Sequence, residues 1–155
     1  MNTALLQLQR YCAYQERCHS EVKQKCLELG LRGNAIEEAM AALITEDFLN
    51  EQRFATAFAG GRFRMQQWGR KKIAAALHQR QVSACCIQKA LLEIDEADYQ
   101  ATLDKLAEQK LESLAREPLP RRKQKTWAYL AQKGYEPEQV TAVVERLAAI
   151  KFGKN

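Results

Sequence analysis

The side chains with the clearest chemistry in this sequence are cations gathered in one acid-free stretch. From residue 52 to residue 92 the chain carries eight Lys or Arg side chains and no Asp or Glu. Without acidic neighbours, ammonium and guanidinium groups attract phosphates and carboxylates, so this pattern is typical of a surface that meets a polyanion or an acidic partner. A solvated helix face is the alternative interpretation. The cations of this stretch that we predict to make such a contact are Arg62, Arg64, Arg70, Lys71, Lys72 and Arg80.

Trp68 lies in the middle of these cations, directly before Gly69, which we expect to interrupt the helix. An exposed indole can stack on a nucleic-acid base or anchor a protein interface, so we include Trp68 among the predicted contact residues. Packing of the indole in the core explains its presence equally well. The sequence alone therefore leaves the role of Trp68 open.

A second run of cations begins the helix that follows Pro118 and Pro120. Cations at a helix N-terminus oppose the helix dipole, which suggests that a partner supplies a counter-charge. A frayed and solvated turn is the other interpretation, because short charge runs are common on surfaces. The members of this run, which we add to the predicted contact residues, are Arg121, Arg122, Lys123 and Lys125.

No pattern in the sequence indicates catalysis, a cofactor or a metal ion. His19 and His78 have no Cys, Ser or carboxylate at the spacing of a catalytic motif. The glycines form no phosphate-binding loop. The five cysteines include no CxxC pair, so we interpret them as reduced thiols. We therefore expect a protein that is not an enzyme and has no catalytic residues, no cofactor and no metal site.

Composition indicates a soluble globular protein. Hydrophobic residues make up 46% of the chain and charged residues 28%, values typical of a packed core with a solvated surface. No run of eighteen apolar residues and no signal-like N-terminus is present. We therefore expect a cytoplasmic protein without membrane association.

Apolar residues return every three or four positions along almost the whole chain, which predicts an all-α fold. The pattern also repeats, because Gly30, Gln81 and Gly134 fall in register when the apolar stripes are aligned, at spacings of 51 and 53 residues. We predict an elongated array of three tandem three-helix repeats, for which a monomer suffices. The predicted segments are 1–47, 48–94 with the acid-free face, and 95–155.

The middle repeat resembles the hallmark of the RecX family of regulatory proteins. The resemblance rests on FLNEQRFATAFAGGRF followed by WGRKKIAAALHQRQVS, and RCHSEV near the N-terminus is similar to the family's entry to its second helix. The family often has two Asp where this chain has Asn50 and Glu51, and often Gly in place of Gln81. Both changes keep the capping or turn chemistry that these positions need. The matching positions are Arg53, Phe54, Ala55, Trp68, Gly69, Ile73, Leu77, Val82 and Ser83.

This resemblance implies a three-helix-repeat protein that binds the RecA recombinase filament on single-stranded DNA. RecX-like proteins lodge in the filament groove and reduce the ATPase, strand-exchange and coprotease activities of RecA. An elongated basic module suits a groove lined by acidic protein surface and nucleic acid. The alternatives are a stand-alone DNA-binding protein that acts through phosphate contacts without RecA, and a helical scaffold for another protein. Charge reversal at Arg70, Lys71 and Lys72 is expected to weaken partner binding without unfolding the chain.

Overall fold

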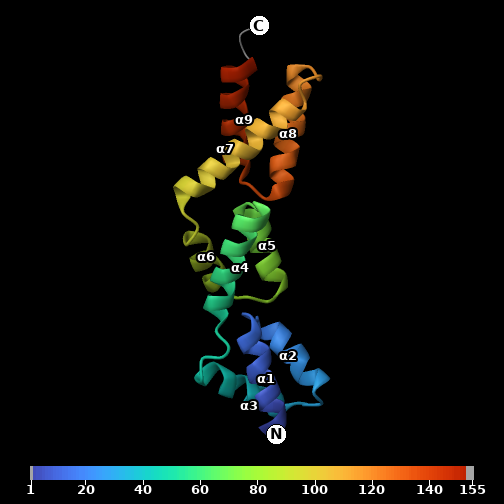
Figure 1. Cartoon of the computed structure of the whole chain (residues 1–155), viewed down its shortest axis with the longest axis vertical. Helices are drawn as coiled ribbons and strands as arrows, with labels where there is room; N and C mark the ends of the chain where they lie inside the picture. Colours follow the sequence, from blue (N-terminus) through green and yellow to red (C-terminus); the bar gives the residue numbers. More distant parts are fainter. Residues whose placement is uncertain (1, 153–155) are drawn as a thin grey trace. The chain divides into compact units, whose positions relative to one another are not determined.

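The computed structural model describes residues 2–152, and within them every regular element is an α-helix (Figure 1). The predicted all-α class is therefore confirmed for this part of the chain. None of the helices between residues 2 and 152 is long and apolar enough to cross a membrane. The helices are α1 (Asn2–Tyr14), α2 (His19–Glu28), α3 (Asn34–Thr45), α4 (Glu51–Gln66), α5 (Arg70–Gln79), α6 (Ala84–Leu92), α7 (Glu96–Ser113), α8 (Leu119–Lys133) and α9 (Pro137–Phe152).

The repeat register predicted from the sequence is visible in the backbone. Gly30, Gln81 and Gly134 all have a left-handed conformation, with φ of 90°, 64° and 102°. At each position the N–H of the following residue bonds to the carbonyl five residues before it, as in a Schellman motif. Gln81 adopts this conformation although its Cβ makes it less favourable than in glycine by about 1 kcal/mol. The second helix of each repeat therefore ends in the same way.

The chain folds into two compact units, and the first comprises residues up to 60 together with 76–93. Its core lies where the apolar stripes of α1, α2 and α3 meet, as the three-and-four-residue spacing predicts. Cys12 and Cys26 pack in this core among aliphatic side chains, as small apolar residues do. The buried residues of this cluster are Leu8, Cys12, Val22, Cys26, Ala39, Met40, Leu43 and Leu49.

Polar residues of the RecX-like motif tie the start of α4 into the first unit. The side chain of Asn50 caps α4 by accepting the Arg53 N–H at 2.9 Å. Glu51 accepts from the N–H and hydroxyl of Ser83 at 3.2 and 3.1 Å, and so caps the N-terminus of α6 from another helix. Burial raises the pKa of Glu51, but hydrogen bonds from Cys86 and Ser83 outweigh it, and the pKa lies below its usual range. Arg53 pairs with Glu16 at 2.7 Å.

The second unit comprises residues 61–75 and the described residues from 94 onward. Here α7, α8 and α9 pack on one another, and their buried faces carry the large side chains that the sequence pattern predicts. The end of α4 and the start of α5 belong to this unit and contribute Phe63 and Ile73 to its buried residues. Three aromatic rings meet at its centre, since Tyr99 lies 5.7 Å from Phe63 and 5.1 Å from Tyr135 between ring centroids.

The helices fall three to each predicted segment, although the compact units divide the chain differently. Helices α4 and α5 each contribute residues to both units, because the unit boundaries lie at residues 60 and 75 inside these helices. The segment boundaries 1–47, 48–94 and 95–155 therefore stay a prediction.

Candidate functional site

The turn between α4 and α5 meets the turn between α8 and α9 through backbone contacts. The Gly69 N–H donates to the Lys133 carbonyl at 2.8 Å, and the Lys71 N–H donates to the Gly134 carbonyl at 2.9 Å. A Cβ added to Gly69 would lie 2.3 to 2.4 Å from backbone atoms of Gly134 and Tyr135. Only glycine allows this approach, so Gly69 lets the two turns touch. Gly69 lies in the predicted break between α4 and α5, and α4 itself ends at Gln66, before the left-handed Gln67.

A buried tyrosine fixes the first residue of α5. The Tyr99 hydroxyl accepts the Arg70 N–H at 2.9 Å and donates to a carboxylate oxygen of Glu136. The Arg70 guanidinium lies over the Tyr99 ring at 3.8 Å and pairs with Glu136 at 3.1 Å and with Glu96. Burial, followed by the hydrogen bond to Glu136, raises the pKa of Tyr99 well above its ordinary range. This network holds the α4–α5 turn against α7 and against Glu136, the residue before α9.

Arg70 is therefore placed differently from the other cations with which the sequence grouped it. Its side chain is only 19% exposed, and both of its carboxylate partners belong to the same unit. A carboxylate at position 70 would face Glu96 and Glu136, which would disrupt the fold as well as the surface. Charge reversal that includes Arg70 is thus no clean test of binding.

Trp68 is half-buried and carries a cation on its ring from each of two helices. The Arg62 guanidinium lies 5.2 Å from the ring and the Lys72 ammonium 4.7 Å. Lys133 donates to the Gln66 carbonyl at 2.7 Å, and burial together with the charge of Lys72 lowers its pKa. Cations from α4, α5 and α8 therefore lie close to one another at this turn.

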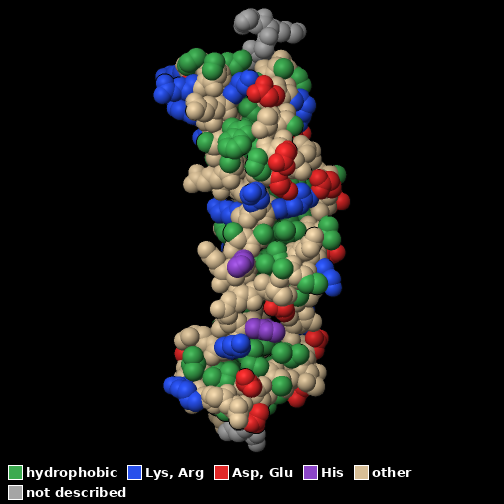
Figure 2. Space-filling view, turned by 180° about the vertical axis from the view of Figure 1, so that it is seen from behind, with side chains coloured by type: hydrophobic (Ala, Val, Ile, Leu, Met, Phe, Trp, Pro, Cys, Tyr) green, Lys and Arg blue, Asp and Glu red, His purple; other side chains and the backbone are tan. Residues whose placement is uncertain are grey.

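We call Arg62, Trp68, Lys71, Lys72 and Lys133 the basic surface. Lys71 is exposed, and the other four are half-buried around the α4–α5 turn. Figure 2 shows a band of Lys and Arg side chains across one face, at the height of the α8–α9 turn in Figure 1. The backbone bonds at Gly69 and Lys71 fix the two turns that carry these side chains.

The second basic run, at the start of α8, finds its counter-charges within the chain. Glu117 pairs with Lys125 at 2.7 Å and lies 3.6 Å from Arg121. Lys123 pairs with Glu145 of α9 at 2.8 Å. These acids reduce the need for a partner to supply the charge, so this run contributes less to the candidate site than the basic surface does.

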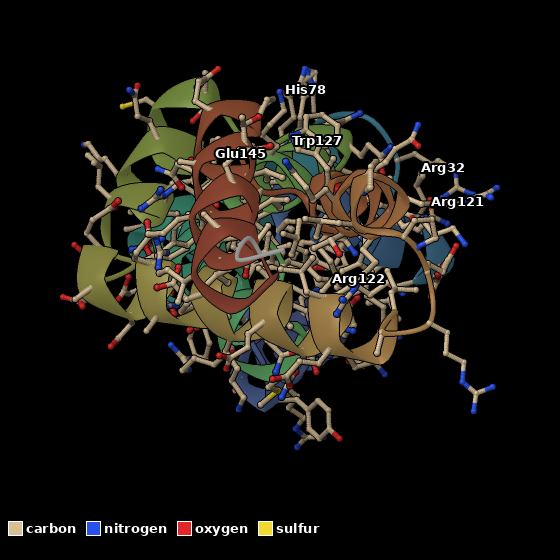
Figure 3. All side chains as sticks on the ribbon, turned by 90° about the horizontal axis from the view of Figure 1, so that it is seen from above. Arg32, His78, Arg121, Arg122, Trp127 and Glu145 are labelled. Atoms are coloured by element: carbon tan, nitrogen blue, oxygen red, sulfur yellow. The ribbon has the colours of Figure 1, made fainter. Side chains whose placement is uncertain are left out.

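Arg122, the remaining member of this run, is buried and is 7% exposed. Its guanidinium donates to the Leu111 carbonyl near the end of α7. Figure 3 shows Arg121 toward the edge of the molecule and Arg122 between the ribbons of α7 and α8. Arg122 thus acts as an internal link between helices.

The two remaining predicted contact residues, Arg64 and Arg80, have other contacts. Arg80 belongs to the first unit, where its guanidinium covers the Phe58 ring at 4.7 Å and donates to the Ala76 carbonyl. Arg64 is exposed on α4 and lines a groove against α7. The structure therefore places Arg62 and Lys72 on the Trp68 ring, Arg64 on the groove against α7, and Arg80 in the first unit.

Sequence reasoning missed Lys133 and Tyr99, which complete the site from helices outside the acid-free stretch. One signal could have found Lys133, because Gly134 falls in register with Gly30 and Gln81 and so marks a tight turn. No local pattern marks Tyr99, since its apolar spacing is that of an ordinary core residue.

Removal of the Tyr99 hydroxyl tests the network that holds the basic surface. Tyr99→Phe leaves the Arg70 N–H and an oxygen of Glu136 without their partner, and should cost about 2 kcal/mol of unfolding free energy. Tyr129→Phe is the matched control, because its half-buried ring has no hydroxyl hydrogen bond to any described residue. Urea denaturation of both variants measures the difference, and equal losses would show that the hydroxyl contributes nothing.

The same substitution should also change how the unfolding free energy depends on pH in alkaline solution. Burial and the bond to Glu136 raise the pKa of Tyr99, and burial raises that of Tyr135, whereas both ionise near pH 10 once unfolded. The stability that each contributes is complete below pH 10 and falls above it by about 1.4 kcal/mol per pH unit. Tyr99→Phe should therefore flatten the decline in unfolding free energy above pH 10.

Fold and site together define a class of protein. The chain is an all-α protein built from three-helix repeats, and it presents a basic surface where two helical turns meet. Comparison with known proteins places this class in one family. The model of the second three-helix domain of RecX matches residues 50–91, and the model of the third matches residues 96–144.

Individual relatives agree with this assignment. The regulatory protein RecX of Pelodictyon phaeoclathratiforme is 30% identical over 133 residues, which cover 84% of this chain and 81% of the relative. That of Clostridium perfringens strain 13 is 32% identical over 133 residues, again 84% of this chain but only 62% of the relative. The chain belongs to the RecX family of regulatory proteins, as the sequence resemblance implied.

Solved structures show the same fold. The crystal structure of RecX from Lactobacillus salivarius matches 94% of this chain and 95% of its own, with a TM-score of 0.87 and 20% sequence identity. Another crystal structure of a regulatory protein RecX matches 93% of this chain and 71% of its own, with a TM-score of 0.84 and 20% identity. The predicted helical repeats are thus those of RecX proteins.

Proposed function

We propose that this chain is a non-enzymatic regulator of the RecA recombinase, which binds RecA filaments on single-stranded DNA. Membership of the RecX family supports this role. The observation that carries the proposal is the basic surface around Trp68, whose cations lie on the end of α4, the start of α5 and the end of α8. We further propose that it acts in the bacterial cytoplasm as a monomer.

The basic surface suits the filament groove because the turns that carry it are fixed before binding. Backbone bonds at Gly69 and Lys71 and the Tyr99 network hold the α4–α5 turn, so little loop ordering is lost on association. Lys71 and Lys72 would meet phosphates of the DNA or carboxylates of the recombinase. Occupation of the groove would bridge neighbouring RecA subunits and slow their ATP hydrolysis, strand exchange and coprotease function.

ATP hydrolysis by RecA on single-stranded DNA tests this function. Titration with the purified chain should slow hydrolysis progressively to a plateau, because each bound molecule restrains the subunits that it bridges. The control is the same titration with heat-unfolded chain, which has the same charge but no fixed surface. Hydrolysis that stays unchanged at a large excess of folded chain would contradict the proposal.

A further inference from the structure

A groove of about 440 Å³ lies in the second unit between the end of α4 and the exposed side of α7. Its floor is apolar and consists of Ala101 and the edges of Phe63 and Leu106, which are each 8% exposed. The volume falls within the range of small-molecule sites in proteins, roughly 300 to 1,000 Å³. The residues that line this groove are not those of the basic surface, so its function is a separate question.

Polar side chains surround the apolar floor. Arg64 and Lys105 face the groove from opposite helices, are exposed, and have no acidic partner among residues 2–152. Asp98 supplies one negative charge, so the groove keeps a net positive charge of one. Hydrogen-bonding groups complete the rim, and these belong to Gln67, Thr102 and Gln109.

We propose that this groove binds one nucleotide unit, with its base on the apolar floor and its phosphate between Arg64 and Lys105. A base has a flat apolar face and polar edges, and so matches an apolar floor inside a rim of amide and hydroxyl groups. An acidic side chain of a protein would use the two cations but would leave the floor exposed. The structure therefore favours a nucleotide over an acidic peptide.

The bound nucleotide can belong to a DNA strand or be a free nucleotide, because both offer the same base and phosphate. The position of the groove favours the strand, because Gln67 lines the groove and directly precedes Trp68 of the basic surface. The Gln67 carbonyl also accepts a hydrogen bond from the Tyr135 hydroxyl. A strand could pass from that surface into the groove within one turn of α4. Only this strand form rests on the proposed function, since a free nucleotide needs no RecA.

The test replaces both cations without altering the core. Arg64→Gln with Lys105→Gln should lower the affinity for an oligothymidylate about tenfold, as two lost phosphate contacts predict, and should reduce the salt slope of log K by about 1.4. The control is Lys89→Gln with Arg116→Gln, which removes the same charges from exposed positions without acidic partners in the described chain. Fluorescence anisotropy across a salt series measures both, and the control should stay within about twofold.

Amide resonances of residues 101–109 locate the ligand independently of affinity. Wild-type chain is titrated with oligothymidylate, with an abasic oligonucleotide of equal length, with thymidine monophosphate and with a polyglutamate peptide. Shifts with the oligothymidylate that are larger than with the abasic strand support the proposal, and shifts with the monophosphate extend it to free nucleotides.

Several results would overturn the proposal. These are equal shifts with the abasic strand, shifts with polyglutamate alone, or unmoved resonances with every probe. Because RecA is absent from these mixtures, failure here leaves the hydrolysis test of the proposed function intact. Conversely, unchanged ATP hydrolysis by RecA would contradict the proposed function but not the proposal that the groove binds a nucleotide.

Discussion

A Gly69→Ala variant should lose about 3 to 5 kcal/mol of unfolding free energy, enough to unfold the second unit or shift its equilibrium heavily. The added Cβ would lie 2.3 to 2.4 Å from backbone atoms of Gly134 and Tyr135, which cannot move aside as a flexible side chain could. The two turns would have to separate. This would break the bonds from the Gly69 N–H to Lys133 and from the Lys71 N–H to Gly134.

Gly61→Ala, inside the preceding helix α4, is the matched control. No atom lies within 4 Å of the position that its Cβ would occupy, and Gly61 has a helical backbone in the interior of α4. It should therefore gain about 0.5 to 1 kcal/mol, because alanine favours the helix. Thermal and urea denaturation followed by circular dichroism measure both variants. A similar small effect in both would show that the two turns do not touch.

Reversal of charge at Lys71 and Lys72 should lower the affinity for RecA filaments on single-stranded DNA about 100-fold. Both residues begin α5 on the basic surface, and neither pairs with an acidic residue in the described chain. Two carboxylates there would repel the phosphates or carboxylates that the surface attracts. Arg70 stays unchanged because it belongs to the Tyr99 network.

The folded state should survive Lys71→Glu with Lys72→Glu. Lys72 lies close enough to Lys133 to lower its pKa, so loss of the Lys72 charge relieves a repulsion. Lys89→Glu with Arg116→Glu changes the net charge equally at exposed positions and should bind filaments as wild type does. Equal binding by wild type and the Lys71 and Lys72 variant, with both folded, would exclude the basic surface as the contact.

Much of the fold could be predicted because local patterns carry it. The apolar spacing specifies helices, and Gly30, Gln81 and Gly134, which fall in register in the sequence, all have left-handed backbones in the structure. Asn50 was recognisable as a cap and Gly69 as part of a break between helices, since both depend on residues within a few positions. These features need no knowledge of distant contacts.

The site could be predicted only in part, because its details depend on residues far apart in the sequence. The acid-free stretch drew attention to Arg62 and Lys72, whose cations lie over the Trp68 ring. The same reasoning counted Arg70 as a surface cation, because its partner Glu136 lies 66 residues away. Local charge composition shows how many cations a segment has, but not which of them the fold pairs internally.

Arg122 illustrates the same limit in the second basic run. Its neighbours in the sequence are cations at the start of α8. Its own guanidinium is buried and donates to the Leu111 carbonyl. One helical turn separates positions that point outward from positions that point inward, and the run spans both. A charge run on a helix therefore cannot be assigned to one role as a whole.

The central claim is that the basic surface recognises a RecA filament and not merely DNA. The direct measurement is the equilibrium binding of the purified chain to RecA filaments on single-stranded DNA, beside the same DNA without RecA, at one salt concentration. We predict an affinity for the filament about tenfold or more above that for bare DNA. Equal affinities that fall steeply with salt would contradict it, since the surface would then bind phosphates alone and act without the recombinase.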